Sequence, residues 1–296
     1  MARMGTVAAR AEQLLGRAVV ATVAVPGGDI CTATKARLSD GSSVLVKTRP
    51  HPPAGFFAAE ADGLRWLADA APAGGVAVPE VRAVAADCLI ISWIEPGRPS
   101  AEAAERLGRE LAATHAAGAE TFGRPDGGTT WIGTAPLPQQ PADAWPEFWA
   151  TARVEPYLRM ARDRAALAEQ DAAAVDQVLS CTAELAGPPE PPARVHGDLW
   201  SGNVVWSAQA HATVVDPAAH GGHRETDLAM LALFGLPQLD RVLGAYTEAS
   251  PLADGWQQRV ALHQLHPLLV HAAMFGGSYG ARAGAAARAA LQPDRT

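Results

Sequence analysis

Three oxygen-bearing side chains in the second half of the sequence have the spacing of a metal-assisted phosphoryl-transfer site. Asp198 and Asn203 lie five residues apart in VHGDLWSGNVV, and Asp216 follows thirteen residues later in VVDP. Asp198 would accept the proton of a substrate hydroxyl, while Asn203 and Asp216 would hold Mg²⁺, which prefers oxygen ligands and bridges the phosphates of ATP. The alternative is that Asp198 and Asn203 cap the turns around Gly197 and Gly202.

An ammonium group in the first half of the sequence could reach the same phosphates. Lys47 ends the strand-like run VLVK, and Glu60 follows thirteen residues later, where it could pair with Lys47. The preceding PGGD turn, with Gly27 and Gly28, resembles a glycine-rich cover for phosphates. Asp29 places an acid in this turn, and its effect on nucleotide binding is left open. A solvated charge at a strand end is the alternative for Lys47. No GxxxxGK[ST] motif is present, which excludes a P-loop site.

The elements that must position these groups fall into two regions. Between residues 19 and 48, three β-rich runs are separated by the PGGD and SDGS turns, and an amphipathic helix and the strands VRAVAA and CLIISWI follow. Beyond residue 100 the apolar period becomes 3.6, interrupted by the GPPEPPA connector and the short β-like runs ARVHGD, NVVWS and ATVVD. We therefore expect an α+β chain with an antiparallel β-rich lobe over residues 1–94 and a mainly helical lobe over residues 95–296.

Composition narrows the classes of protein further. The 296 residues are 48% hydrophobic and carry a formal charge of −7, so we expect a folded chain that does not bind nucleic acid. The three cysteines form no CxxC pair, which argues against a disulfide framework or a zinc site; a redox role for Cys31 is left open. We find neither a signal-like apolar stretch nor a window long enough to span a bilayer, and expect a cytoplasmic protein without membrane contact.

Two long motifs resemble one known family. HGDLWSGN at 196–203 and DPAAHGGHRETDLAM at 216–230, together with the later WQQRVALHQLHPLLVHAAMFGGSY, resemble the fructosamine kinase or ketosamine kinase family. That family is a branch of the bilobal aminoglycoside phosphotransferase and protein-kinase-like fold. The resemblance implies ATP- and Mg²⁺-dependent phosphorylation of the 3-hydroxyl of a ketosamine, free or protein-bound, a reaction that reverses glycation. Another small-molecule kinase of this fold, with an aminoglycoside, choline-like or sugar acceptor, and a nucleotide-binding pseudokinase are the alternatives.

The resemblance also implies roles for individual residues. Asp198 becomes the general base, and Asn203 and Asp216 become the metal ligands. The residues that it places around the nucleotide are Gly27, Gly28, Lys47, Glu60, Ser92, Trp93, Ile94 and Glu95. Of these, the last four would form the hinge that pairs with adenine.

In and after the catalytic loop, residues 196–203, the candidate residues either bind substrate or support the loop. Trp200 could stack on the sugar or the cationic amine of a ketosamine, or pack the loop. The substrate candidates in the GGHRE loop, for which stabilising ion pairs are the alternative, are His223, Arg224 and Glu225. His196 and Asp227 are expected to brace the loop. The histidines 263, 266 and 271 interleave with apolar residues, so we expect them to be buried rather than to bind metal.

Overall fold

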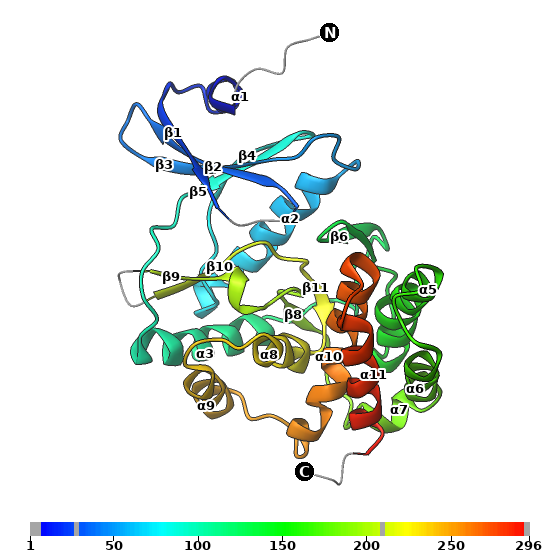
Figure 1. Ribbon diagram of the computed structural model, residues 1–296. Helices are drawn as coiled ribbons and strands as arrows, with labels where there is room; N and C mark the ends of the chain where they lie inside the picture. The colour runs from blue at the N-terminus through cyan, green and yellow to red at the C-terminus, as the bar shows by residue number, and fades with distance from the viewer. Residues whose placement is uncertain (1–6, 27–29, 208–210, 293–296) are drawn as a thin grey trace.

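The first part of the chain forms a five-stranded antiparallel sheet with one helix on each face (Figure 1). The structure is a computed structural model, and it describes residues 7–26, 30–207 and 211–292. The sheet has the strand order β1-β2-β3-β5-β4. Its elements and their helices are α1 (Val7–Leu15), β1 (Val19–Val25), β2 (Thr32–Leu38), β3 (Ser43–Thr48), α2 (Phe56–Ala68), the 3-10 turn η1 (Ala71–Ala73), β4 (Val81–Ala85) and β5 (Cys88–Ser92). Gly27, Gly28 and Asp29 lie outside the described residues.

Side-chain alternation in the central strands decides which group faces which helix. Val44 and Ile90 pack with α1 in one buried cluster, whereas Ile91 and the partly buried Leu45 pack with α2 in another. Successive side chains of a strand point to opposite faces of the sheet. Lys47 therefore shares the face of Leu45 and points toward α2.

The second part of the chain is mainly helical and carries three two-stranded antiparallel sheets. Its elements are α3 (Ala101–Ala116), β6 (Thr129–Ile132), β7 (Ala135–Pro138), α4 (Trp145–Phe148), the π-helical turn η2 (Trp149–Val154), α5 (Glu155–Asp163), α6 (Glu169–Ser180), α7 (Thr182–Leu185), β8 (Ala193–Val195), the 3-10 turn η3 (Ser201–Asn203), β9 (Val204–Ser207), β10 (His211–Val214), β11 (His220–Gly222), α8 (Arg224–Leu233), α9 (Leu239–Ala249), α10 (Trp256–Phe275) and α11 (Tyr279–Ala290). The strand pairs β8–β11 and β9–β10 lie between the five-stranded sheet and the helices (Figure 1).

The expected α+β architecture is confirmed, with β-rich and helical regions in the expected order. The proposed lobe boundary at residue 94 falls in the extended segment between β5 and α3. All three cysteines are free. Within the described residues, no helix is both long and apolar enough to cross a bilayer.

Four elements were not expected from the sequence: α1, β11, β6 and β7. The helix α1 lies in a segment that was considered only as a possible signal, and β11 is just three residues long. The β6–β7 hairpin contains Pro136 and Pro138, and proline normally argues against a strand. This hairpin tolerates them because β7 pairs with β6 alone.

The crossing of α3 and α9 gives a direct test of packing. A Cβ atom on Gly108 would lie 2.2 Å from the carbonyl oxygen of Val242, whereas a Cβ on Gly244, within α9, would meet nothing within 4 Å. We expect Gly108→Ala to lower the free energy of unfolding by about 2 kcal/mol through overpacking. Gly244→Ala should raise it by about 0.5–1 kcal/mol, because alanine favours the helix. Denaturant unfolding measures both, and equal effects of the two substitutions would contradict the described crossing.

Candidate functional site

The ammonium group of Lys47 lies between two carboxylates that come from different parts of the chain. Its Nζ is 2.6 Å from Glu60 Oε1 on α2 and 2.8 Å from Asp216 Oδ1, which follows β10. Lys47 is only 7% exposed. Burial disfavours its charge, but the two carboxylates outweigh that cost and raise the pKa of Lys47. The site therefore holds a permanent positive charge between the sheet and the helical region.

The two carboxylates differ in their access to solvent. The side chain of Glu60 is 12% exposed, and that of Asp216 is 46% exposed. Asp216 also has a left-handed backbone, with φ of 56°, a conformation that aspartate tolerates better than most residues. Glu60 therefore positions Lys47 from within, while Asp216 offers an accessible carboxylate.

A buried carboxylate fixes the backbone of the loop that follows β8. Asp227, in the first turn of α8, accepts hydrogen bonds from the backbone N–H groups of His196 and Gly197 at 2.7 and 2.9 Å. His196 Nδ1 accepts from the backbone N–H of Asp198, which leaves Nε2–H to donate to the carbonyl of Val215. The loop before Asp198 is thereby tied both to α8 and to the segment that carries Asp216.

Sequence reasoning missed two further supports of this loop. His115 lies 3.2 Å from Asp227 through Nε2 and 2.8 Å from the hydroxyl of Tyr246 through Nδ1. The only available signal was a histidine within the alanine-rich helix of residues 101–116, and this signal does not indicate where the side chain points.

Asp198 and Asn203 meet across the turn η3. Asn203 Nδ2 donates to the backbone carbonyl of Asp198 at 2.8 Å and lies 3.3 Å from its Oδ2. Burial raises the pKa of the Asp198 carboxyl to about 7, the charge of Asp216 adds to this, and the hydrogen bond from Asn203 opposes it. A cation bound near Asp198 would offset the effect of the Asp216 charge on it.

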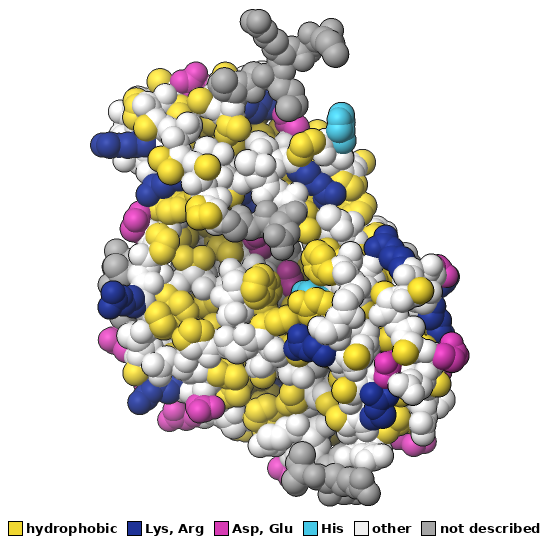
Figure 2. Space-filling view, viewed as in Figure 1, with side chains coloured by type: hydrophobic (Ala, Val, Ile, Leu, Met, Phe, Trp, Pro, Cys, Tyr) yellow, Lys and Arg dark blue, Asp and Glu magenta, His cyan; other side chains and the backbone are white. Residues whose placement is uncertain are grey.

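The donor set fits Mg²⁺. Because Nδ2 makes the hydrogen bonds of Asn203, its amide oxygen has no hydrogen-bond partner among the described residues. That oxygen and the exposed Asp216 carboxylate are the hard ligands that Mg²⁺ takes in small number, leaving positions for phosphate and water. Acidic side chains are visible in the hollow at mid-height of the molecule (Figure 2).

The segment after β5 has backbone groups that no other described residue binds. Ser92 ends β5, and the backbone N–H of Trp93 donates to the carbonyl of Ser43. The N–H and carbonyl of Ile94 have no hydrogen-bond partner among the described residues. Trp93 Nε1 donates to Glu95 Oε2 at 2.7 Å, and the ammonium of Lys35 lies 4.3 Å from the Trp93 ring. These contacts fix the Trp93 and Glu95 side chains and leave the Ile94 backbone open.

Comparison with known proteins places the chain among enzymes. The family model for fructosamine kinase matches residues 4–292. A candidate fructosamine-3-kinase from Thermobifida fusca, known from a crystal structure, is 49% identical to this chain. The two structures superpose over 97% of this chain and 99% of the Thermobifida fusca chain, with a TM-score of 0.91. A protein from Enterococcus faecium named "probable ketoamine kinase" is 33% identical over 88% of this chain and 91% of its own.

The chain belongs to the fructosamine kinase family. A solved choline kinase from Streptococcus pneumoniae, 16% identical with a TM-score of 0.62 and covering 96% of this chain and 97% of its own, shares the protein-kinase-like fold. Family membership makes the chain an ATP-dependent kinase with a hydroxyl group as acceptor. The groups around Lys47 and Asp198 are the ones that such a reaction requires.

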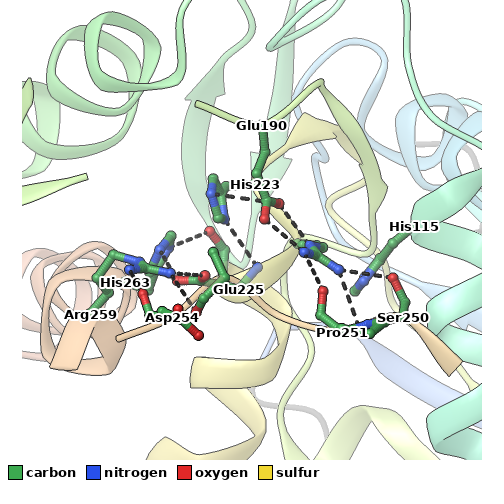
Figure 3. A network of polar contacts seen from close by, with 12 residues as sticks. His115, Glu190, His223, Glu225, Ser250, Pro251, Asp254, Arg259 and His263 are labelled. Carbon is green, nitrogen blue, oxygen red and sulfur yellow. Dashed lines mark hydrogen bonds and ion pairs between the residues drawn. The ribbon is translucent and has the colours of Figure 1, made fainter. Parts of the chain in front are cut away.

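In this fructosamine kinase family member, the substrate candidates of the GGHRE loop lie in a network of polar contacts that also includes His115 (Figure 3). Glu225 accepts two hydrogen bonds from Arg259, at 2.9 and 2.5 Å. Arg224 makes two hydrogen bonds of 2.7 Å to Glu190. His223 Nδ1 accepts from the backbone N–H of Glu225, and its ring is tilted against that of Trp145 with centroids 5.0 Å apart. Arg224 and Glu225 thus form ion pairs of the kind considered as the alternative for this loop.

This network also has the residue types of a metal site, but its charge is already balanced. His223, Glu225 and His263 each place a ligand atom within 4.8 Å of the others. Burial alone would raise the pKa of Glu225, but the contacts with His263 and Arg259 lower it to about 2. The guanidinium of Arg259 supplies the positive charge that an ion would otherwise bring.

Burial of the α10 histidines predicts how stability depends on pH. His263 and His266 are buried, and His271 is half-buried. His266 Nδ1 donates to the carbonyl of Arg153, and burial, with the charge of Arg153 adding to it, lowers the pKa of His266 to about 3. Because an unfolded histidine titrates near 6.5, this group's contribution is fully present above about pH 6.5. It is lost as the pH falls toward 3.

We therefore expect the wild-type protein to lose more stability on acidification than His266→Gln. Glutamine can still donate to the carbonyl of Arg153 but cannot take up a proton. Between pH 7 and pH 5 the difference in lost unfolding free energy should be about 2 kcal/mol. Denaturant unfolding at both pH values measures it, and parallel losses in the two proteins would show that His266 is not held neutral.

Proposed function

We propose that this chain phosphorylates the 3-hydroxyl of ketosamines of the fructosamine and ribulosamine type, with ATP and Mg²⁺, as a deglycation activity. One observation carries the proposal: Lys47, Glu60 and Asp216 meet in one ion-pair cluster, and Asp198 and Asn203 meet in the adjoining loop. The family to which the chain belongs supports the ketosamine acceptor. In the resulting 3-phosphate, the phosphorylated sugar tends to detach from the amine spontaneously.

In this proposal Asp198 is the general base. Its raised pKa of about 7 suits a group that must take a proton from a hydroxyl near neutral pH. The bonds from Asp227 to the preceding backbone hold the loop still while the hydroxyl approaches. The carboxylate is therefore in place before the acceptor arrives, which lowers the cost of orientation.

The nucleotide binds between the sheet and the helical region. Asn203 and Asp216 hold Mg²⁺, which when bound neutralises charge on the phosphates. Lys47 contacts the phosphates, and Glu60 keeps its ammonium directed into the cleft. The four hinge residues receive adenine, with the unpaired backbone of Ile94 as the hydrogen-bonding edge. Gly27 and Gly28, outside the described residues, complete the proposed nucleotide site as its phosphate cover.

The acceptor binds on the side of Asp198 that carries Trp200. This indole is 38% exposed and lies two residues after the base. Its face suits the protonated amine of a ketosamine, because an indole attracts cations and stacks on sugar rings.

Asp198→Asn tests the base. The substitution keeps the shape of the side chain but removes the proton acceptor, so kcat should fall by about 10²- to 10⁴-fold, with nucleotide affinity largely retained. ATP consumption is measured with ribulosamine, fructosamine, aminoglycoside, choline and unmodified sugar acceptors. Turnover of Asp198→Asn at the wild-type rate would refute the assigned base.

Preference of the wild type for a non-glycated acceptor would favour another small-molecule kinase. Nucleotide-dependent thermal stabilisation without any product would favour a pseudokinase.

Lys47→Met tests the phosphate contact. Methionine fills a similar volume without charge, so kcat/KM for ATP should fall by about 10²- to 10³-fold, the usual cost of removing one donor that stabilises developing charge. Arg109→Gln is a matched control, because Arg109 is exposed on α3 and has no ion pair among the described residues. An unchanged kcat/KM in folded Lys47→Met would contradict the proposed role of the ammonium.

A further inference from the structure

A continuous set of aromatic side chains extends from the catalytic loop to the start of α11. We call it the aromatic surface; its members are Trp200, Phe234, His271, Phe275 and Tyr279. The Trp200 and Phe234 rings meet edge to face with centroids 5.9 Å apart, and His271 lies 5.2 Å from Phe234. His271 also lies 5.7 Å from Phe275 and 4.9 Å from Tyr279. Phe275 is 53% exposed, so this surface is open to a ligand.

The aromatic surface borders the mouth of the cleft. A Cβ atom on Gly133, in the β6–β7 turn, would lie 2.6 Å from the Met274 side chain and 3.4 Å from that of Ile30. Ile30 directly follows the proposed phosphate cover, and Met274 directly precedes Phe275. Hydrophobic side chains surround the hollow on this face of the molecule (Figure 2). A molecule bound at Asp198 therefore has an apolar path along which its remaining part can lie.

A cation lies beside this path. The Arg282 guanidinium carbon lies 5.7 Å from the Phe234 ring centroid and 5.5 Å from that of Tyr279. Within the described parts of the chain, no carboxylate forms an ion pair with Arg282. The pKa of His271 is lowered, chiefly by burial and further by the charge of Arg282, so the neighbouring ring is neutral at pH 7. The rings hold the guanidinium in place and leave its N–H groups free for an anion.

We propose that Arg282 is a specificity-determining residue that binds a carboxylate on the amine substituent of the acceptor. The inference rests on the proposed function and specifies its substrate: a ketosamine whose amine carries an apolar chain ending in a carboxylate. The sugar lies at Asp198, the amine at Trp200, the chain on the aromatic surface and the carboxylate at Arg282. Arginine suits this position because its planar fork matches the two oxygens of a carboxylate.

Two acceptors with chains of equal length isolate the carboxylate. The ribulosamine of 6-aminohexanoate and the ribulosamine of hexylamine differ only in that group. The wild type should show about fivefold higher kcat/KM for the carboxylate-bearing acceptor, chiefly through KM, as expected for one accessible ion pair. Arg282→Gln should abolish this preference, chiefly by lowering kcat/KM for the carboxylate-bearing acceptor. Arg282→Glu should reverse the preference, and Arg109→Gln should retain the wild-type ratio.

The outcomes separate the inference from the proposed function. If the wild type phosphorylates both ribulosamines equally well, or if Arg282→Gln keeps the preference, the role of Arg282 is refuted while the ketosamine kinase activity stands. If the wild type phosphorylates neither ribulosamine, the proposed function fails and the inference fails with it. Preference for the carboxylate that disappears only in the Arg282 variants supports both.

Discussion

A buried ammonium group shared by two carboxylates is the interaction on which the site depends. Removing Lys47 from water is costly, and the cost is offset only if carboxylates approach it closely. Glu60 comes from a helix on the sheet, and Asp216 comes from the helical region. The requirement to pair one charge therefore draws both regions of the chain to a single point. Whatever binds between them meets a fixed cation flanked by an accessible acid.

The loop that carries Asp198 is held by another carboxylate, that of Asp227, which is buried away from the cleft. Asp227 uses both oxygens on the backbone of the catalytic loop, and His115 and Tyr246 support it from behind. The carboxylate of Asp198 therefore contacts only Asn203 among the described residues. The ion pairs of Glu225 and Arg224 form a third cluster, which fastens α8 to α10 and to the connector before β8.

The sequence supports some of these conclusions better than others. The strand-like runs VLVK and CLIISWI are legible from their residue types, but both are continuously apolar, so they do not show which face of the sheet carries Lys47. The Asp198, Asn203 and Asp216 spacing predicts a shared site, because each residue adjoins a short strand. Nothing in the sequence shows that Glu225 of the GGHRE loop turns toward Arg259 rather than toward the cleft. The direction of the Glu225 side chain depends on the packing of α8 against α10, which carries Arg259.

The aromatic surface was also beyond sequence reasoning. Trp200, Phe234 and Phe275 come from a loop and two helix ends, so no periodic pattern joins them, and Arg282 follows in the first turn of another helix. Only the packing of α8, α10 and α11 brings them together. Similarly, the β6–β7 hairpin is concealed by its prolines, although it forms part of the border of the cleft.

A crystal structure with a non-hydrolysable ATP analogue, Mg²⁺ and a ribulosamine tests the central claim most directly. The account predicts that the ammonium of Lys47 contacts the phosphates and that Asn203 and Asp216 hold the metal. It also predicts the acceptor 3-hydroxyl within about 2.6–3.2 Å of an Asp198 oxygen. A hydroxyl held by another side chain, or Lys47 directed away from the nucleotide, would contradict it.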